Sequence, residues 1–139
     1  MQWLLEVVVL PVSDLDRAKA FYAGRLGFVV DHDTTVMEGT RVVQLTPPGS
    51  HCSVVIGEGA VVPPMPPGSV RGLQLVVADV VAAQAELRER GVEVSDVTSV
   101  DGDADKLARG GTALDNVGFC FFEDPDGNGW AVQQISARG

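Results

Sequence analysis

Cysteine and histidine are both scarce in this chain, with two of each among 139 residues. Cys52 and Cys120 lie far apart in apolar runs and lack a Cys-x-x-Cys spacing, which favours two buried, reduced thiols over a disulfide. His32 and His51 stand alone, one at the end of an expected strand and one beside a turn, where a surface role is more usual than metal binding. The sequence therefore argues against a disulfide framework.

Basic residues are also in short supply, since 10 Lys and Arg stand against 19 Asp and Glu. The resulting charge of −9 disfavours nucleic-acid binding, which needs cations to neutralise phosphates. The excess of acid suits a cationic ligand, but it also simply favours solubility. Residues 1–6 lack a basic segment and a cleavage site for secretion, and the apolar stretch 7–13 is too short to cross a bilayer. We therefore expect a cytoplasmic protein without a nucleic-acid or membrane partner.

What the chain does contain is an internal repeat. An apolar run, an aspartate, a helical pattern and a glycine before a second apolar run begin at Val9 and again at Gln74. Asp14 and Asp79 are predicted helix N-caps, and the two helices are expected to end at Gly27 and Gly91. Strands are predicted at residues 3–12, 28–31, 41–46, 52–56, 73–77, 92–97, 118–123 and 130–135.

These elements predict one α+β domain over residues 1–139, made of two tandem βαβββ modules that form a curved sheet around a cavity. Module one covers about 1–57, a Gly- and Pro-rich linker covers 58–70, and module two covers about 71–139. The polar, glycine-rich stretch 99–117 is predicted to lack regular structure and to serve as a binding loop or lid, or to be mobile.

Two motifs resemble those of a known family. Val12-Ser13-Asp14-Leu15-Asp16-Arg17-Ala18 with Leu26-Gly27-Phe28, and Asp124-Pro125-Asp126-Gly127-Asn128-Gly129-Trp130, are similar in order and spacing to the vicinal oxygen chelate superfamily. This superfamily groups glyoxalases, bleomycin-resistance proteins and extradiol dioxygenases. The resemblance implies the two-module fold and a divalent metal held by His and Glu from the first and fourth strands of each module.

The ligand positions implied by the resemblance carry no metal-binding side chain here. They fall on Val7, Val55, Gly72 and Ala131. Glu6 adjoins the first position, but neighbouring strand residues point to opposite faces, so we expect its side chain to face away from the cavity. We therefore predict no metal site and no cofactor.

Strand alternation then assigns the residues that line the cavity. The glutamines Gln74 and Gln133 are expected to orient a neutral or aromatic ligand, because uncharged amides fix its orientation without a large desolvation cost. The alternative is that these positions fill a closed core, against which the cost of unpaired buried amides argues. Small residues at Gly72 and Ala131 are expected to leave volume for that ligand. Trp130 is expected to pack beneath the helices. The predicted ligand-binding set is Val7, Val9, Ser53, Val55, Gly72, Gln74, Phe121, Asn116, Ala131 and Gln133.

The sequence gives little indication of catalysis, since no nucleophile–base pair or nucleotide-binding motif is present. Arg109 and Asp115 are the catalytic candidates, with a role as solvated loop residues as the alternative. We predict a homodimeric, metal-independent protein that binds a small organic molecule, resembling the drug-sequestering antibiotic-resistance branch of the family. The alternatives are a lyase- or isomerase-type enzyme, with no metal or with unusual ligands, and a dimeric scaffold without a ligand. The modules pair within one chain or exchange between two.

Overall fold

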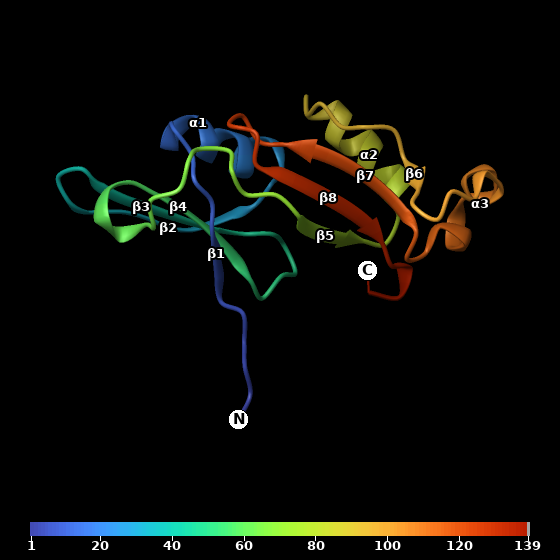
Figure 1. Cartoon of the computed structure of the whole chain (residues 1–139), viewed down its shortest axis with the longest axis horizontal. Helices are drawn as coiled ribbons and strands as arrows, with labels where there is room; N and C mark the ends of the chain where they lie inside the picture. The colour runs from blue at the N-terminus through green and yellow to red at the C-terminus, as the bar shows by residue number, and fades with distance from the viewer. Residues whose placement is uncertain (139) are drawn as a thin grey trace. The chain divides into compact units, whose positions relative to one another are not determined.

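The computed structural model describes residues 1–138, which form two compact units. Unit 1 contains residues 1–70 and 124–128, and unit 2 contains residues 71–123 and 129–138. Each unit is built on a four-stranded sheet in which the first strand pairs in parallel with the fourth (Figure 1). The internal repeat of the sequence is therefore a repeat of topology, as predicted for two βαβββ modules.

The sheet of unit 1 has the strand order β1-β4-β3-β2. Its strands are β1 (Val7–Val9), β4 (Ser53–Gly57), β3 (Thr40–Thr46) and β2 (Val29–Met37). Helix α1 (Leu15–Lys19) continues into the π-helix η1 (Ala20–Arg25), and the 3-10 turn η2 (Gly59–Val61) follows β4. Asp14 caps α1 as predicted, since its Oδ1 accepts a hydrogen bond from Arg17 N at 3.0 Å. The core of the unit contains Leu10, Ala18, Phe21, Tyr22, Phe28, Val43, Leu45, Val54 and Ile56.

The sheet of unit 2 repeats this plan with the order β5-β8-β7-β6. Its strands are β5 (Leu73–Val77), β8 (Gly129–Gln134), β7 (Gly118–Glu123) and β6 (Thr98–Ser99). Its helices and 3-10 turns are α2 (Val80–Glu89), α3 (Ala104–Arg109), η3 (Gly111–Leu114) and η4 (Ser136–Arg138). Asp79 caps α2, since its Oδ1 accepts a hydrogen bond from Ala82 N at 3.0 Å. Helix α2 lies against β7 and β8 (Figure 1), over a core of Val80, Leu114, Cys120, Phe122, Trp130 and Val132.

Three predicted elements differ from the structure because strand length depends on a neighbour. The strand expected at 3–12 is only Val7–Val9, since its partner β4 begins at Ser53, opposite Val7. The strand expected at 28–31 extends to Met37 because it pairs with β3 along its length. Residues 92–97 are not a strand; Val94 makes one isolated bridge, to Phe122, and β6 follows later.

The stretch 99–117 is structured, contrary to expectation. It contains α3 and η3, and Asp103 caps α3 by accepting a hydrogen bond from Asp105 N at 3.0 Å. The short helix could not be predicted from an apolar periodicity, because none of its residues is buried. No helix in residues 1–138 has the length and apolar character needed to cross a membrane.

The Asp-Pro-Asp-Gly-Asn turn is a buried hydrogen-bonding centre of unit 1. The side chain of Asp124 accepts hydrogen bonds from the turn's own backbone and from Tyr22 Oη at 2.7 Å. Asn128 Nδ2 donates to Pro11 O at 3.0 Å, and Asn128 Oδ1 accepts from Val70 N. Gly68 packs so closely that a Cβ there would lie 2.0 Å from the carbonyl oxygen of Asp126. The family motif therefore has a structural role, since it holds the end of β1 and the linker in place.

Candidate functional site

One face of the unit 2 sheet carries a paired set of amides beside aromatic rings. Residues of β5, β7 and β8 that lie opposite one another in the register alternate between the two faces of the sheet. One face packs under α2, and the other is left partly open to solvent. We call this open face the amide face; it consists of Gln74, Val76, Phe119, Phe121, Ala131 and Gln133.

The two glutamines of the amide face are bonded to each other. Gln74 Nε2 donates to Gln133 Oε1 at 2.7 Å, and Gln133 Nε2 donates to Asn116 O at 2.8 Å. Gln74 is exposed and Gln133 is half-buried. The two glutamines lie on one face of the sheet, as strand alternation predicted, and their role in binding a ligand stays a prediction. They are not buried and unpaired, because each glutamine has the other as a partner.

Two phenylalanines complete the amide face. The rings of Phe119 and Phe121 stack with centroids 6.0 Å apart and planes inclined by 11°. Phe121 is 45% exposed and Val76 is 38% exposed, so an apolar surface reaches solvent beside the amides. Trp130 lies on the opposite face, where it stacks on Phe122, and this confirms that it packs beneath the helix. The amide face can offer stacking and uncharged hydrogen bonds together.

The residues predicted in unit 1 share one face of their own sheet. Val7 lies opposite Ser53, and Val9 lies opposite Val55, across the parallel β1–β4 pair. The three valines are half-buried, and Ser53 is buried with its Oγ 2.6 Å from Thr46 Oγ1. These four residues stay predicted ligand contacts.

Gly72 is required at its position by the backbone conformation, which was not predicted from the sequence. Its φ is +87°, a left-handed conformation that glycine adopts without strain, and a Cβ built there would meet nothing within 4 Å. The glycine is therefore explained by the entry into β5, not only by space for a ligand. Asn116 has the only positive φ of a non-glycine residue in 1–138, at 69°.

The catalytic candidates are both engaged in structural contacts. Arg109 Nε lies 3.0 Å from Asp105 Oδ2, one turn earlier in α3. Asp115 accepts from Ser136 N at 2.8 Å, from Ser136 Oγ at 2.6 Å and from Gln134 Nε2 at 3.1 Å. The Ser136 hydroxyl, then the Ser136 N–H and the Gln134 amide, lower the pKa of the Asp115 carboxyl. No ion pair or hydrogen bond among the described residues joins Arg109 to Asp115. A catalytic role for either residue stays a prediction.

Replacing Asp115 by asparagine is expected to lower the melting temperature by a few degrees at pH 7, because the ionised carboxylate anchors the segment around Ser136. A carboxyl whose pKa is lower in the folded state stabilises the fold fully above its unfolded pKa of about 3.9 and loses this effect as the pH falls. The difference between parent and variant should therefore narrow at pH 3. Thermal melts at both pH values check this, with the exposed Asp96→Asn as control. Equal melting temperatures at pH 7 would contradict the anchoring role.

The family-type metal does not fit the residues at its expected positions. Val7, Val55 and Ala131 have hydrocarbon side chains and Gly72 has none, so none supplies a donor atom. Glu6 is exposed outside β1, and His51 is exposed beside β4. Among residues 1–138 there is no group of three His, Cys, Asp or Glu side chains placed to hold a metal ion. The absence of a bound metal from the working protein stays a prediction.

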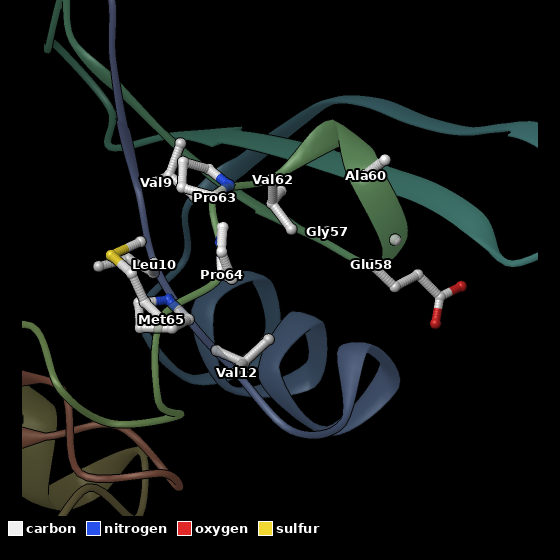
Figure 2. Close-up of a pocket in the computed structure, with 12 residues that line it drawn as sticks. Val9, Leu10, Val12, Gly57, Glu58, Ala60, Val62, Pro63, Pro64 and Met65 are labelled. Carbon is white, nitrogen blue, oxygen red and sulfur yellow. The ribbon is translucent and has the colours of Figure 1, made fainter.

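A groove of about 560 Å³ in unit 1 was not predicted from the sequence. It lies between the end of β1 and the linker, and Figure 2 shows the side chains of Leu10, Val12, Val62 and Met65 around it. Glu58 is the one lining residue with a polar side chain, and its carboxylate points away from the apolar residues (Figure 2). The apolar residues among the prolines of the linker are the sequence signal for this groove. It lacks the oriented polar groups of the amide face.

Comparison with known proteins identifies a family and several solved structures that this chain resembles. The family model described as the glyoxalase/bleomycin resistance protein/dioxygenase superfamily matches residues 4–132. TnmS3, described as an antibiotic-binding protein from Streptomyces sp. CB03234, is 33% identical, with a TM-score of 0.73 over 97% of this chain and 98% of its own. A glyoxalase/bleomycin resistance protein from the same organism is 34% identical, with a TM-score of 0.70 over 94% and 100%.

A member of the superfamily from Sphaerobacter thermophilus DSM 20745 is 26% identical, with a TM-score of 0.73 over 96% of this chain and 98% of its own. No curated protein matches the chain. The match to the family model covers nearly the whole sequence, and it agrees with the repeated topology and the buried turn. The chain therefore belongs to the glyoxalase/bleomycin resistance protein/dioxygenase superfamily.

Proposed function

We propose that this protein binds a planar aromatic organic molecule on the amide face, and that it does so without a metal ion. The observation that carries the proposal is the Gln74–Gln133 amide pair beside the exposed stack of Phe119 and Phe121. Val7, Val9, Ser53 and Val55 stay proposed ligand contacts on the sheet of unit 1.

The energetics favour a neutral, largely apolar ligand. Covering the exposed ring of Phe121 and the side chain of Val76 removes apolar surface from water, at about 25 cal/mol per Å². The amides supply hydrogen bonds without the desolvation cost of a charge. A flat ring would stack on Phe121 while its polar substituents reach the amides.

Sequestration is favoured over turnover. TnmS3 is described as an antibiotic-binding protein and is 33% identical over 97% of this chain, which supports an antibiotic-like ligand here. The two side chains considered for acid–base chemistry are held by Asp105 and by Ser136 with Gln134. We infer that the ligand is held and released unchanged.

We also propose that the protein is a cytoplasmic homodimer. Residues 1–6, here called the N-terminal segment, leave four large apolar side chains exposed: Met1, Trp3, Leu4 and Leu5. Strands β1 and β5 each have one neighbour in their own sheet, so each leaves an edge that another strand can pair with. A second copy of the chain would cover the apolar segment and an open edge together.

Titration of the protein with a panel of two- and three-ring aromatic compounds, including 2-naphthol, tests the proposed site. Calorimetry is expected to detect binding that is unchanged after treatment with EDTA. Phe121→Ala should weaken it about tenfold or more, because stacking on an aromatic ring contributes roughly 1–3 kcal/mol.

The matched control is Val81→Ala, since Val81 is another exposed apolar residue but lies on α2. It should leave the affinity unchanged. Absence of binding by every member of the panel at millimolar concentration would contradict the proposed function. Loss of binding after EDTA treatment, with one metal ion per chain found by elemental analysis, would contradict metal independence.

A further inference from the structure

The hydrogen bonds of the amide face run in one direction only, because a backbone carbonyl fixes which atom of each glutamine donates and which accepts. The carbonyl oxygen of Asn116 can only accept, so the group of Gln133 that lies 2.8 Å from it must be the N–H group. Gln133 therefore turns its oxygen toward Gln74, and Gln74 must in turn present its own N–H group at 2.7 Å. The orientation of both amides follows from one backbone carbonyl.

That carbonyl is held firmly. Asn116 adopts a left-handed conformation with φ 69°, and its N–H donates to Gln134 O at 2.8 Å. The side chain of Gln134 donates to Asp115 Oδ1 and to Gly111 O, and is buried. The Asn116 carbonyl, where the row of hydrogen-bonded amides begins, is thus held in place by its own N–H group and by the neighbouring Asp115–Gln134 contact. Gln133 passes this orientation on, so it is a positioning residue for Gln74.

The other end of the chain is the carbonyl oxygen of Gln74, Oε1. Among residues 1–138, no side chain or backbone group donates a hydrogen bond to it. An amide that donates through its nitrogen becomes a better acceptor at its oxygen, because hydrogen bonds in a chain polarise one another. The amide face therefore presents a strengthened acceptor on the exposed residue Gln74, which is separated from Phe121 in the register by Ala131 of β8.

We infer that Gln74 Oε1 selects ligands that carry an O–H or N–H donor on the edge of a planar aromatic ring. This inference rests on the proposed function and names the ligand class for the same site. A ligand with a donor satisfies the oxygen, whereas a ligand of the same shape without one covers the oxygen and leaves it unpaired. An unpaired acceptor buried in this way lowers affinity by an amount that corresponds to roughly a five- to hundredfold change.

Two matched probes test the inference: 2-naphthol, which carries an O–H group, and 2-methoxynaphthalene, in which a methyl group replaces that hydrogen. Calorimetric titration of the parent protein should give an affinity for 2-naphthol that is about five- to hundredfold higher than that for the ether. Gln74→Met keeps the length of the side chain but removes the amide. In this variant the ratio of the two affinities should fall to the ratio expected from the difference in water solubility between the two probes.

Two further variants separate positioning from direct contact. Gln133→Met leaves Gln74 in place but frees its amide to turn, so the ratio of the affinities for 2-naphthol and the ether should fall toward the value found for Gln74→Met. Asn116→Gly keeps the backbone carbonyl in a conformation that glycine adopts freely, so the preference should be retained. Circular dichroism confirms that each variant is folded before its titration is interpreted.

The outcomes distinguish this inference from the proposed function. Equal affinity for the two probes, or a preference that persists in Gln74→Met, would overturn the donor requirement while leaving aromatic binding in place. Binding of neither probe would overturn both. A preference lost in Asn116→Gly but kept in Gln133→Met would assign the selection to the Asn116 side chain instead.

Discussion

Alanine in place of Asp124 is expected to lower the free energy of unfolding by about 3–5 kcal/mol, a large share of the total for a domain of this size. The Asp124 side chain is 5% exposed and accepts five hydrogen bonds. The donors are the backbone N–H groups of Asp126, Gly127 and Asn128, the hydroxyl of Tyr22 and the side-chain amide of Asn128. Removing the carboxylate takes away the acceptor that these five donor groups share, in a site with little access to water.

Urea denaturation measures this change, and Asp96→Ala serves as the control. Asp96 makes one ion pair, with Arg88, and its side chain is 89% exposed, so its loss should change the free energy by less than about 0.5 kcal/mol. Asp124→Asn should also be strongly destabilised, because its amide N–H groups would face other donors. An Asp124→Ala variant as stable as the Asp96→Ala control would show that the buried turn does not hold the fold.

The second large effect is expected at the N-terminal segment. Replacing Trp3, Leu4 and Leu5 together by serine should convert the proposed dimer into a monomer at micromolar concentration. Trp3 and Leu4 are each 86% exposed, and Leu5 is 70% exposed, within the single chain. Burying such side chains contributes roughly 1.5–3 kcal/mol each, so losing all three should raise the dissociation constant of the dimer by a factor of a hundred or more.

Sedimentation equilibrium over a range of concentrations measures the dissociation constant. A matched control replaces two exposed valines outside the segment, Val81→Ser on α2 and Val100→Ser after β6, and should remain dimeric. Melting of the variant should still be cooperative, because the segment contributes no residue to the buried core. A monomeric parent protein would contradict the homodimer, and a dimeric triple variant would assign the contact to another surface.

Local signals determined much of the architecture from the sequence alone. Asp14 and Asp79 were predictable as caps because an N-cap bond joins a side chain to a backbone group three residues later. The alternation of β5 and β8 was predictable because strand geometry has a period of two residues. The same alternation placed Gln74 and Gln133 together on one face, although no pairing between them could be inferred.

The tertiary structure decided what depends on a neighbour distant in sequence. Strand β1 begins where β4 begins, and β2 continues as far as β3 pairs with it, so their lengths could not be inferred from composition. Asp115 was a catalytic candidate because it lies in a polar loop, yet its oxygens accept from Ser136 and Gln134, which are about 20 positions away.

The sequence by itself determined the repeated topology, the helix caps and the face of each strand, because these depend on residues within a turn or two of one another. Only the tertiary structure decided the direction of the amide chain, since it depends on a backbone carbonyl at Asn116 that folding brings to Gln133. The sequence contains the two glutamines and the phenylalanines of the amide face. Which atom of Gln74 is bonded to Gln133 is a property of the folded chain, because an isolated amide turns freely and a bonded one does not.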